Sequence, residues 1–85
     1  MNVYDSRYQE FIRRLRKARQ HAGFSQAQAA KLLNRQQTYV SKSELGERRV
    51  DVIEALEFAK LYKKSVASLT NGLLGKRAMA RTSRK

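Results

Sequence analysis

Apolar residues recur at intervals of three and four along most of the chain, which is the spacing that gives an α-helix one apolar face. The first such stretch runs from about Ser6 to Ala22, and its opposite face carries four basic residues between positions 13 and 17. Gly23 ends this stretch, because glycine readily adopts the left-handed conformation that follows a helix. We expect a helix whose inward positions are Tyr8, Phe11, Ile12, Leu15, Ala18 and Ala22.

Two shorter helices are predicted next. Ser25 can accept a hydrogen bond from an unpaired backbone N–H and so begin a helix rich in alanine and leucine. Asn34 ends it, because asparagine tolerates the left-handed conformation nearly as well as glycine. A third helix runs from Gln36 to about Leu45, and apart from Val40 it has mainly polar residues.

Two further helices complete the pattern. Asp51 can cap a fourth helix, and Ser65 starts a short fifth one that runs through Val66 and Leu69 to Asn71. The inward stripe expected for the fourth helix is Val52, Ala55, Leu56, Ala59 and Tyr62. Because the chain has no proline and its four glycines fall between the helical stretches, we predict an all-α fold.

The predicted domain covers residues 7–74, between a flexible N-terminal arm (1–6) and a basic tail (75–85). The tail has five basic residues, no acidic ones and too little apolar surface to offset the entropy lost on ordering, so we expect it to be disordered.

Net charge limits the partners that this chain can have. Lysine and arginine total 19 against 7 acidic residues, which gives a formal charge of +12. Such an excess on one small domain favours polyanions, nucleic acids above all.

The composition also argues against several classes of function. The chain has no cysteine and one histidine, so we expect neither a metal site nor a thiol nucleophile, and no cofactor. No grouping of acid, base and nucleophile is visible, so we do not expect an enzyme. No apolar run reaches the roughly 18 residues of a membrane span, and the first 20 residues lack the apolar segment of a signal peptide, so we expect no membrane contact and a cytoplasmic protein.

The second and third predicted helices fit a helix-turn-helix. Small alanines in the first would let the two helices approach closely, and a polar second helix could enter a groove of DNA. A generic three-helix bundle would show the same helix-starting and helix-ending residues, so helical spacing alone leaves both interpretations open.

A longer pattern resembles a known family. The segments LRKARQHAGFSQAQAAKLLN, RQQTYVSKSELGERR and DVIEALEFAKLYKKSVASLTNGL follow one another without insertion. The combination of Ser25-Gln26, a turn residue eight positions later, and Glu44-x-Gly46 at the end of the third helix resembles the lambda-repressor and Cro type of helix-turn-helix, often called the XRE family. The resemblance covers about sixty of the 85 residues. It implies a five-helix lambda-repressor-like DNA-binding domain with its helix-turn-helix at helices 2 and 3.

The resemblance also implies which residues read bases. Gln37 lies near the start of the third helix, and its amide offers one donor and one acceptor that match N6 and N7 of adenine. Lys42 could donate to guanine, and Thr38 could meet a thymine methyl group or a phosphate. The candidate base contacts are Gln37, Thr38, Tyr39, Ser41 and Lys42. For each of them the alternative is a solvated helix face.

Other positions are implied to contact phosphate or to hold the fold. The phosphate candidates are Gln26, Arg35, Arg48 and Arg49. Gln26 would also brace Gln37. The family pairs an arginine of the first helix with the glutamate before the terminating glycine, so Arg19 and Glu44 should form a partly buried salt bridge. The family usually has a bulky apolar residue at position 43, and here Ser43 either leaves a core slot thinly filled or bonds the preceding turn.

The function predicted from these features is a sequence-specific regulator of transcription that binds double-stranded DNA. We expect a repressor that binds a two-fold symmetric operator as a homodimer. Leu73 and Leu74, with Phe58 or Leu61 if they face outward, could supply the apolar patch where two copies pair. One alternative is an antitoxin or adaptor that also binds a protein partner. Another is a non-specific nucleic-acid binder dominated by the basic tail.

Overall fold

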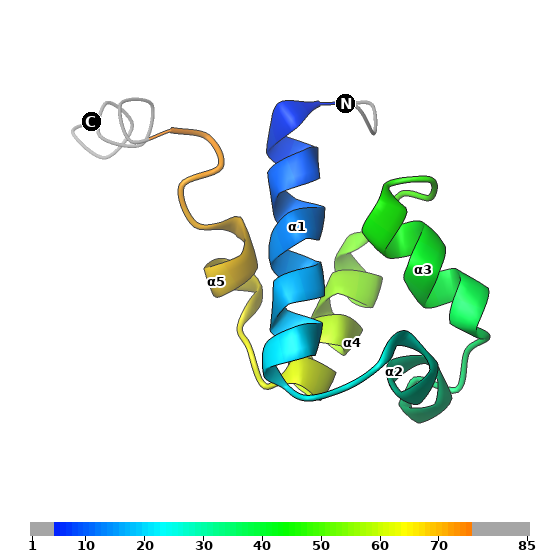
Figure 1. Ribbon diagram of the computed structural model, residues 1–85. Helices are drawn as coiled ribbons and strands as arrows, with labels where there is room; N and C mark the ends of the chain where they lie inside the picture. Colours follow the sequence, from blue (N-terminus) through cyan, green and yellow to red (C-terminus); the bar gives the residue numbers. More distant parts are fainter. Residues whose placement is uncertain (1–4, 76–85) are drawn as a thin grey trace.

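The computed structural model describes residues 5–75, and these form five α-helices joined by short loops. The helices are α1 (Ser6–His21), α2 (Gln26–Leu32), α3 (Gln37–Leu45), α4 (Val52–Tyr62) and α5 (Val66–Thr70). Figure 1 shows α1 at the centre, with α2 and α3 on one side of it and α5 on the other. The five-helix, all-α architecture predicted from the sequence is confirmed.

The predicted arm and tail lie mostly outside the described residues. Positions 1–4 and 76–85 are not described, so the expectation of a disordered basic tail stays a prediction. The end of the expected arm belongs to the first helix instead. Asp5 caps α1 by accepting a 2.8 Å hydrogen bond from the backbone N–H of Arg7, and Ser6 is the first helical residue.

Side chains from α1 form the centre of the core. Five of the six inward positions expected for this helix are buried, with Leu15 fully so, whereas Ala22 is exposed because it lies just past the last helical residue. Val40 of α3 and Phe58 of α4 are the other largest fully buried apolar side chains. Helices far apart in sequence therefore share one core around α1.

The inward stripe predicted for α4 is wrong at two positions. Ala55, Ala59 and Tyr62 are buried as expected, but Val52 is 67% exposed and Leu56 is 50% exposed. Phe58, which the sequence left open as an outward residue, is buried at 1% exposure and stacks on Tyr62 with ring centroids 5.9 Å apart. The buried stripe is rotated toward Phe58, because the larger ring fills the space between α4 and its neighbours. Leu61, the other residue considered for an outward patch, packs partly buried against the core.

Four of the five helices have a side chain that caps their N-terminus. Asp5, Ser25, Asp51 and Ser65 each accept a hydrogen bond from a backbone N–H in the first turn of their helix. Gln36, at the start of α3, makes no such hydrogen bond. The N–H of Tyr39 donates to the carbonyl of Gln36 at 3.0 Å, whereas those of Gln37 and Thr38 remain available to an outside acceptor.

Candidate nucleic-acid interface

The α2–turn–α3 unit is compact because its contact residues are small. Ala29 and Ala30 of α2 are buried, and the N–H of Arg35 donates to the carbonyl of Ala30 across the turn at 2.9 Å. Asn34 has φ = 59°, the left-handed conformation expected for it. The turn thus directs the chain from α2 into α3 within four residues.

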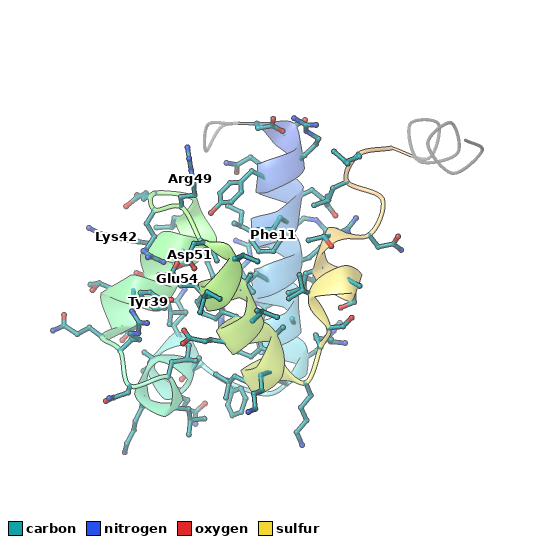
Figure 2. All side chains as sticks on the ribbon, turned by 180° about the vertical axis from the view of Figure 1, so that it is seen from behind. Phe11, Tyr39, Lys42, Arg49, Asp51 and Glu54 are labelled. Carbon is teal, nitrogen blue, oxygen red and sulfur yellow. The ribbon has the colours of Figure 1, made fainter. Side chains whose placement is uncertain are left out.

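One face of α3 is open to solvent and polar. Gln37, Thr38 and Lys42 are exposed and Ser41 is half-buried, at positions that share a helical face. The opposite face carries Val40, Ser43 and Glu44, all of them buried. Figure 2 shows the side chain of Lys42 projecting from α3 away from the domain. The structure therefore brings four of the five candidate base contacts together on one surface.

Tyr39, the fifth candidate, lies elsewhere. Its half-buried ring stacks on Phe58 of α4, with centroids 5.7 Å apart and an 18° angle between the planes. The guanidinium carbons of Arg35 and Arg48 lie 4.5 and 4.4 Å from the ring centroid. Burial raises the pKa of the Tyr39 hydroxyl above its usual value. The ring faces α4 and two arginines, a role that the sequence analysis did not anticipate.

Arg48 joins the end of α3 to the start of α4. Its Nη1 donates to the hydroxyl of Ser43 at 3.2 Å, and its Nη2 donates to Glu54 Oε2 at 2.8 Å. This hydrogen bond from Arg48 holds the pKa of Glu54 below its usual value. Arg48 was a candidate phosphate contact, yet these two donors are engaged within the protein.

Ser43 makes this arrangement possible. Its hydroxyl donates to the carbonyl of Tyr39, one turn earlier, at 2.7 Å, and it accepts from Arg48. The side chain is fully buried. Of the two outcomes expected for serine at this position, the structure shows the bond to the preceding turn. A bulky side chain there would occupy the space that Arg48 uses, so Ser43 and Arg48 form one unit.

A buried ion pair holds α3 against α1. Arg19 Nε and Nη2 donate to the two carboxylate oxygens of Glu44 at 2.6 and 3.1 Å. The Glu44 side chain is 2% exposed and that of Arg19 is 10% exposed. Arg19 also donates to the carbonyl of Phe24 at 2.8 Å, and its hydrogen bond to Glu44 raises its own pKa. Three hydrogen bonds thus fix the angle at which α1, α3 and the loop before α2 meet.

Gln26 completes this cluster. Its amide nitrogen donates to Glu44 Oε1 at 3.0 Å, so this side chain braces the carboxylate of the ion pair, while its expected contact with Gln37 stays a prediction. The residue is half-buried at the first position of α2. The ion pair sets the orientation of Gln26, because its amide nitrogen and Nη2 of Arg19 both donate to Oε1 of Glu44.

The two remaining phosphate candidates are exposed beside α3. Arg35 lies in the turn before α3, and its side chain is 41% exposed with Nη2 3.7 Å from Glu57. It lines a hollow between α2 and α3, together with Lys31 and Gln37. Arg49 is exposed on the loop after α3, and Figure 2 shows it projecting outward. Positive side chains therefore flank both ends of the polar face.

Residues 5–75 hold no group of three or more His, Asp or Glu side chains placed to bind a metal ion. No helix in that range is long and apolar enough to cross a bilayer.

Comparison with known proteins places the chain in a family. The family described as helix-turn-helix domain matches residues 10–69. An XRE-family like protein from Pseudomonas syringae pv. tomato str. DC3000 has a similar solved structure, with a TM-score of 0.76 and 38% sequence identity over 85% of this chain and 88% of that one. A search among curated proteins found no match. This chain is therefore a member of the XRE family of helix-turn-helix proteins.

Proposed function

We propose that this protein is a sequence-specific regulator that binds double-stranded DNA by inserting α3 into the major groove. The observation that carries the proposal is the solvent-exposed polar face formed by Gln37, Thr38, Ser41 and Lys42. A helix fits the major groove of B-form DNA, where each base pair presents a distinct set of donors and acceptors. The buried pair of Arg19 and Glu44 holds this face in one orientation.

Each of these side chains suits a particular contact. Gln37 can pair with N6 and N7 of adenine, and Lys42 can donate to O6 or N7 of guanine. The methyl group of Thr38 can meet a thymine methyl group, and the hydroxyl of Ser41 can donate to or accept from several bases. Gln37 lies in the first turn of α3, which is where recognition helices of this kind contact base edges.

Phosphate contacts would fix the domain on the duplex. Arg35 and Arg49 suit this role, because a forked guanidinium binds phosphate through two donors. The start of α3 has no side-chain cap, so its N–H groups can also meet a phosphate. Gln26 keeps its proposed phosphate contact, since the amide nitrogen that donates to Glu44 has a second hydrogen. For Arg48 we propose the internal role described above.

We further propose that the protein acts as a homodimer on a two-fold symmetric site. A groove between α1 and the segment after α5 is lined by Tyr8, Phe11, Leu73 and Leu74, and Leu74 is 63% exposed. An exposed leucine beside an apolar groove suits a symmetric contact, in which each copy supplies both parts. A dimer bound to a promoter would block other proteins from the same DNA, which makes a repressor the simplest outcome.

A protein partner is the second candidate for that groove, as in an antitoxin or adaptor. Its apolar lining would accept a partner side chain as readily as Leu74 of a second copy. The purified protein alone distinguishes the two cases. A homodimer selects a palindromic site by itself, whereas a protein that needs a partner selects a palindrome only when that partner is present.

Selection of duplexes from a random pool by the purified protein tests the proposal. We would work at about 0.15 M salt, where contacts with phosphate alone are partly screened. Recovery of one sequence repeated about a two-fold axis is expected. Enrichment of a single half-site would contradict the dimer, and salt-sensitive binding without any enriched sequence would replace this proposal with non-specific binding.

A further inference from the structure

We propose that Tyr39 is a positioning residue, whose ring holds the guanidinium of Arg35 in place for a phosphate contact, and that it does not itself read a base. This inference rests on the proposed DNA-binding function. It assigns a role to the one candidate base contact that the structure turns away from the exposed face of α3.

The ring of Tyr39 is itself fixed. It stacks on Phe58, which is 1% exposed and packs against Tyr62 in the core. The carbonyl of Tyr39 accepts the hydrogen bond from Ser43, so the backbone of this turn is tied to the buried side of α3. A ring held from the core in this way is a rigid surface for another side chain.

Arg35 lies on that surface. Its guanidinium carbon is 4.5 Å from the ring centroid, within the range of a cation–π interaction. Its only ion-pair partner among the described residues is Glu57, at 3.7 Å, and the two side chains are 41% and 47% exposed. Arg35 also lines the same hollow as Gln37 at the start of α3. Stacking thus places a forked donor next to the face that would enter the groove.

Tyr39 lies beside two arginines but positions only Arg35 for a phosphate contact, because Arg48 is held by other partners. Arg48 lies at a similar distance from the ring, 4.4 Å, but two of its donors bind Ser43 and Glu54. Its cation is compensated by a carboxylate of low exposure, and it holds the loop after α3 in place. Within residues 5–75 the one ion pair of Arg35 is the exposed contact with Glu57, so its donors remain available to a phosphate.

Double-mutant cycles on DNA binding test this assignment. The probes are the duplex enriched by selection and an unrelated duplex of equal length, because a phosphate contact acts on both. Tyr39→Leu removes the aromatic surface and should weaken binding by about 3- to 5-fold, as expected for an exposed cation–π contact. The same change in the Arg35→Ala background should have almost no effect, since Arg35 is the side chain that it positions.

Three controls sharpen the cycle. Tyr39→Phe keeps the ring and should bind as the unmodified protein does. In the Arg49→Ala background, Tyr39→Leu should still weaken binding by its full factor. Arg35→Lys changes an exposed turn residue, so it should fold even if Tyr39→Leu does not. It keeps the charge but loses the forked guanidinium that lies over the ring, and it should itself weaken binding by about 3- to 5-fold.

Several outcomes would overturn the inference. Equal losses from Tyr39→Leu with and without Arg35 would show that the two residues act separately, and full binding by Arg35→Lys would show that stacking is unimportant. A changed base preference at one position in Tyr39→Phe or Tyr39→Leu would make Tyr39 a base reader while leaving the proposed function intact. Failure of the unmodified protein to bind either duplex would overturn the function and this inference together.

Discussion

Arg19 of α1 and Glu44 of α3 form an ion pair with two hydrogen bonds that lies almost wholly inside the protein. Burying two charges is costly, and such a pair adds little net stability compared with apolar residues of the same size. Removing one partner is different, because the other charge then remains buried without compensation. The pair therefore acts mainly to fix how α3, with its exposed polar face, sits on the core.

Replacing Arg19 by leucine should destabilise the protein by about 3 to 5 kcal/mol, since Glu44 would be stranded. The thermal unfolding midpoint, followed by circular dichroism, measures this. Arg16→Leu is the matched control, because Arg16 is exposed on the same helix and should change the midpoint little. An unchanged midpoint in Arg19→Leu would mean that the ion pair does not contribute to the folded state.

Two buried tyrosines should respond in opposite ways to loss of the hydroxyl. Tyr8 accepts a 2.8 Å hydrogen bond from the N–H of Val50 and donates to the carbonyl of Arg48, whereas the buried hydroxyl of Tyr62 has no partner among residues 5–75. Tyr8→Phe should cost about 1 to 3 kcal/mol, because it leaves a buried N–H unpaired. Tyr62→Phe should be neutral or stabilising. Urea unfolding measures the free energy of unfolding of both variants. A larger loss in Tyr62→Phe than in Tyr8→Phe would contradict the hydrogen bonding described for the two hydroxyls.

Stability should fall in acid partly through Glu54. Its hydrogen bond from Arg48 lowers its pKa in the folded protein, so the stabilisation is complete above the unfolded value and is lost as the pH drops through the folded one. The unfolding midpoint of Glu54→Gln should therefore be lower near neutral pH and less dependent on pH below about 4.5. Glu47→Gln, an exposed residue of the loop that carries Arg48, is the control. Parallel pH profiles for the native protein and Glu54→Gln would contradict this reading.

A single introduced charge tests the proposed dimer contact. Leu74→Asp places a carboxylate at the rim of the groove between α1 and the end of the described chain, so it should convert a dimer to a monomer in sedimentation experiments. Leu56→Asp alters a similarly exposed leucine on α4 and should leave the dimer intact. The reverse result would move the interface to the exposed apolar residues of α4.

Features governed by neighbouring residues could be predicted from the sequence. Ser25, Asp51 and Ser65 begin helices as expected, and Asn34 adopts the left-handed turn conformation, because each depends on backbone groups within a few positions. The five helices and their order followed from the spacing of apolar residues, and the family fixed how they pack.

Features that depend on packing between distant helices could not be predicted. From its position in α3, Tyr39 was expected to contact bases. Its ring instead stacks on Phe58, nineteen residues further along the chain. The available signal was that Tyr39 lies four residues after Arg35 and four residues before the small Ser43. Likewise, Leu56 and Phe58 are both apolar, and only the three-dimensional packing decides which of them is buried.

The central claim is that the exposed face of α3 reads bases, and Gln37 is the residue that tests it most directly. Affinities of the native protein and of Gln37→Ala would be measured on duplexes that vary each base pair of the selected site in turn, with Gln20→Ala on α1 as the control. We predict that Gln37→Ala loses discrimination at one position in each half-site and keeps it elsewhere, at a cost of about 1 to 3 kcal/mol for the preferred base. Uniform weakening on every duplex, with all preferences unchanged, would show that α3 does not read sequence through Gln37.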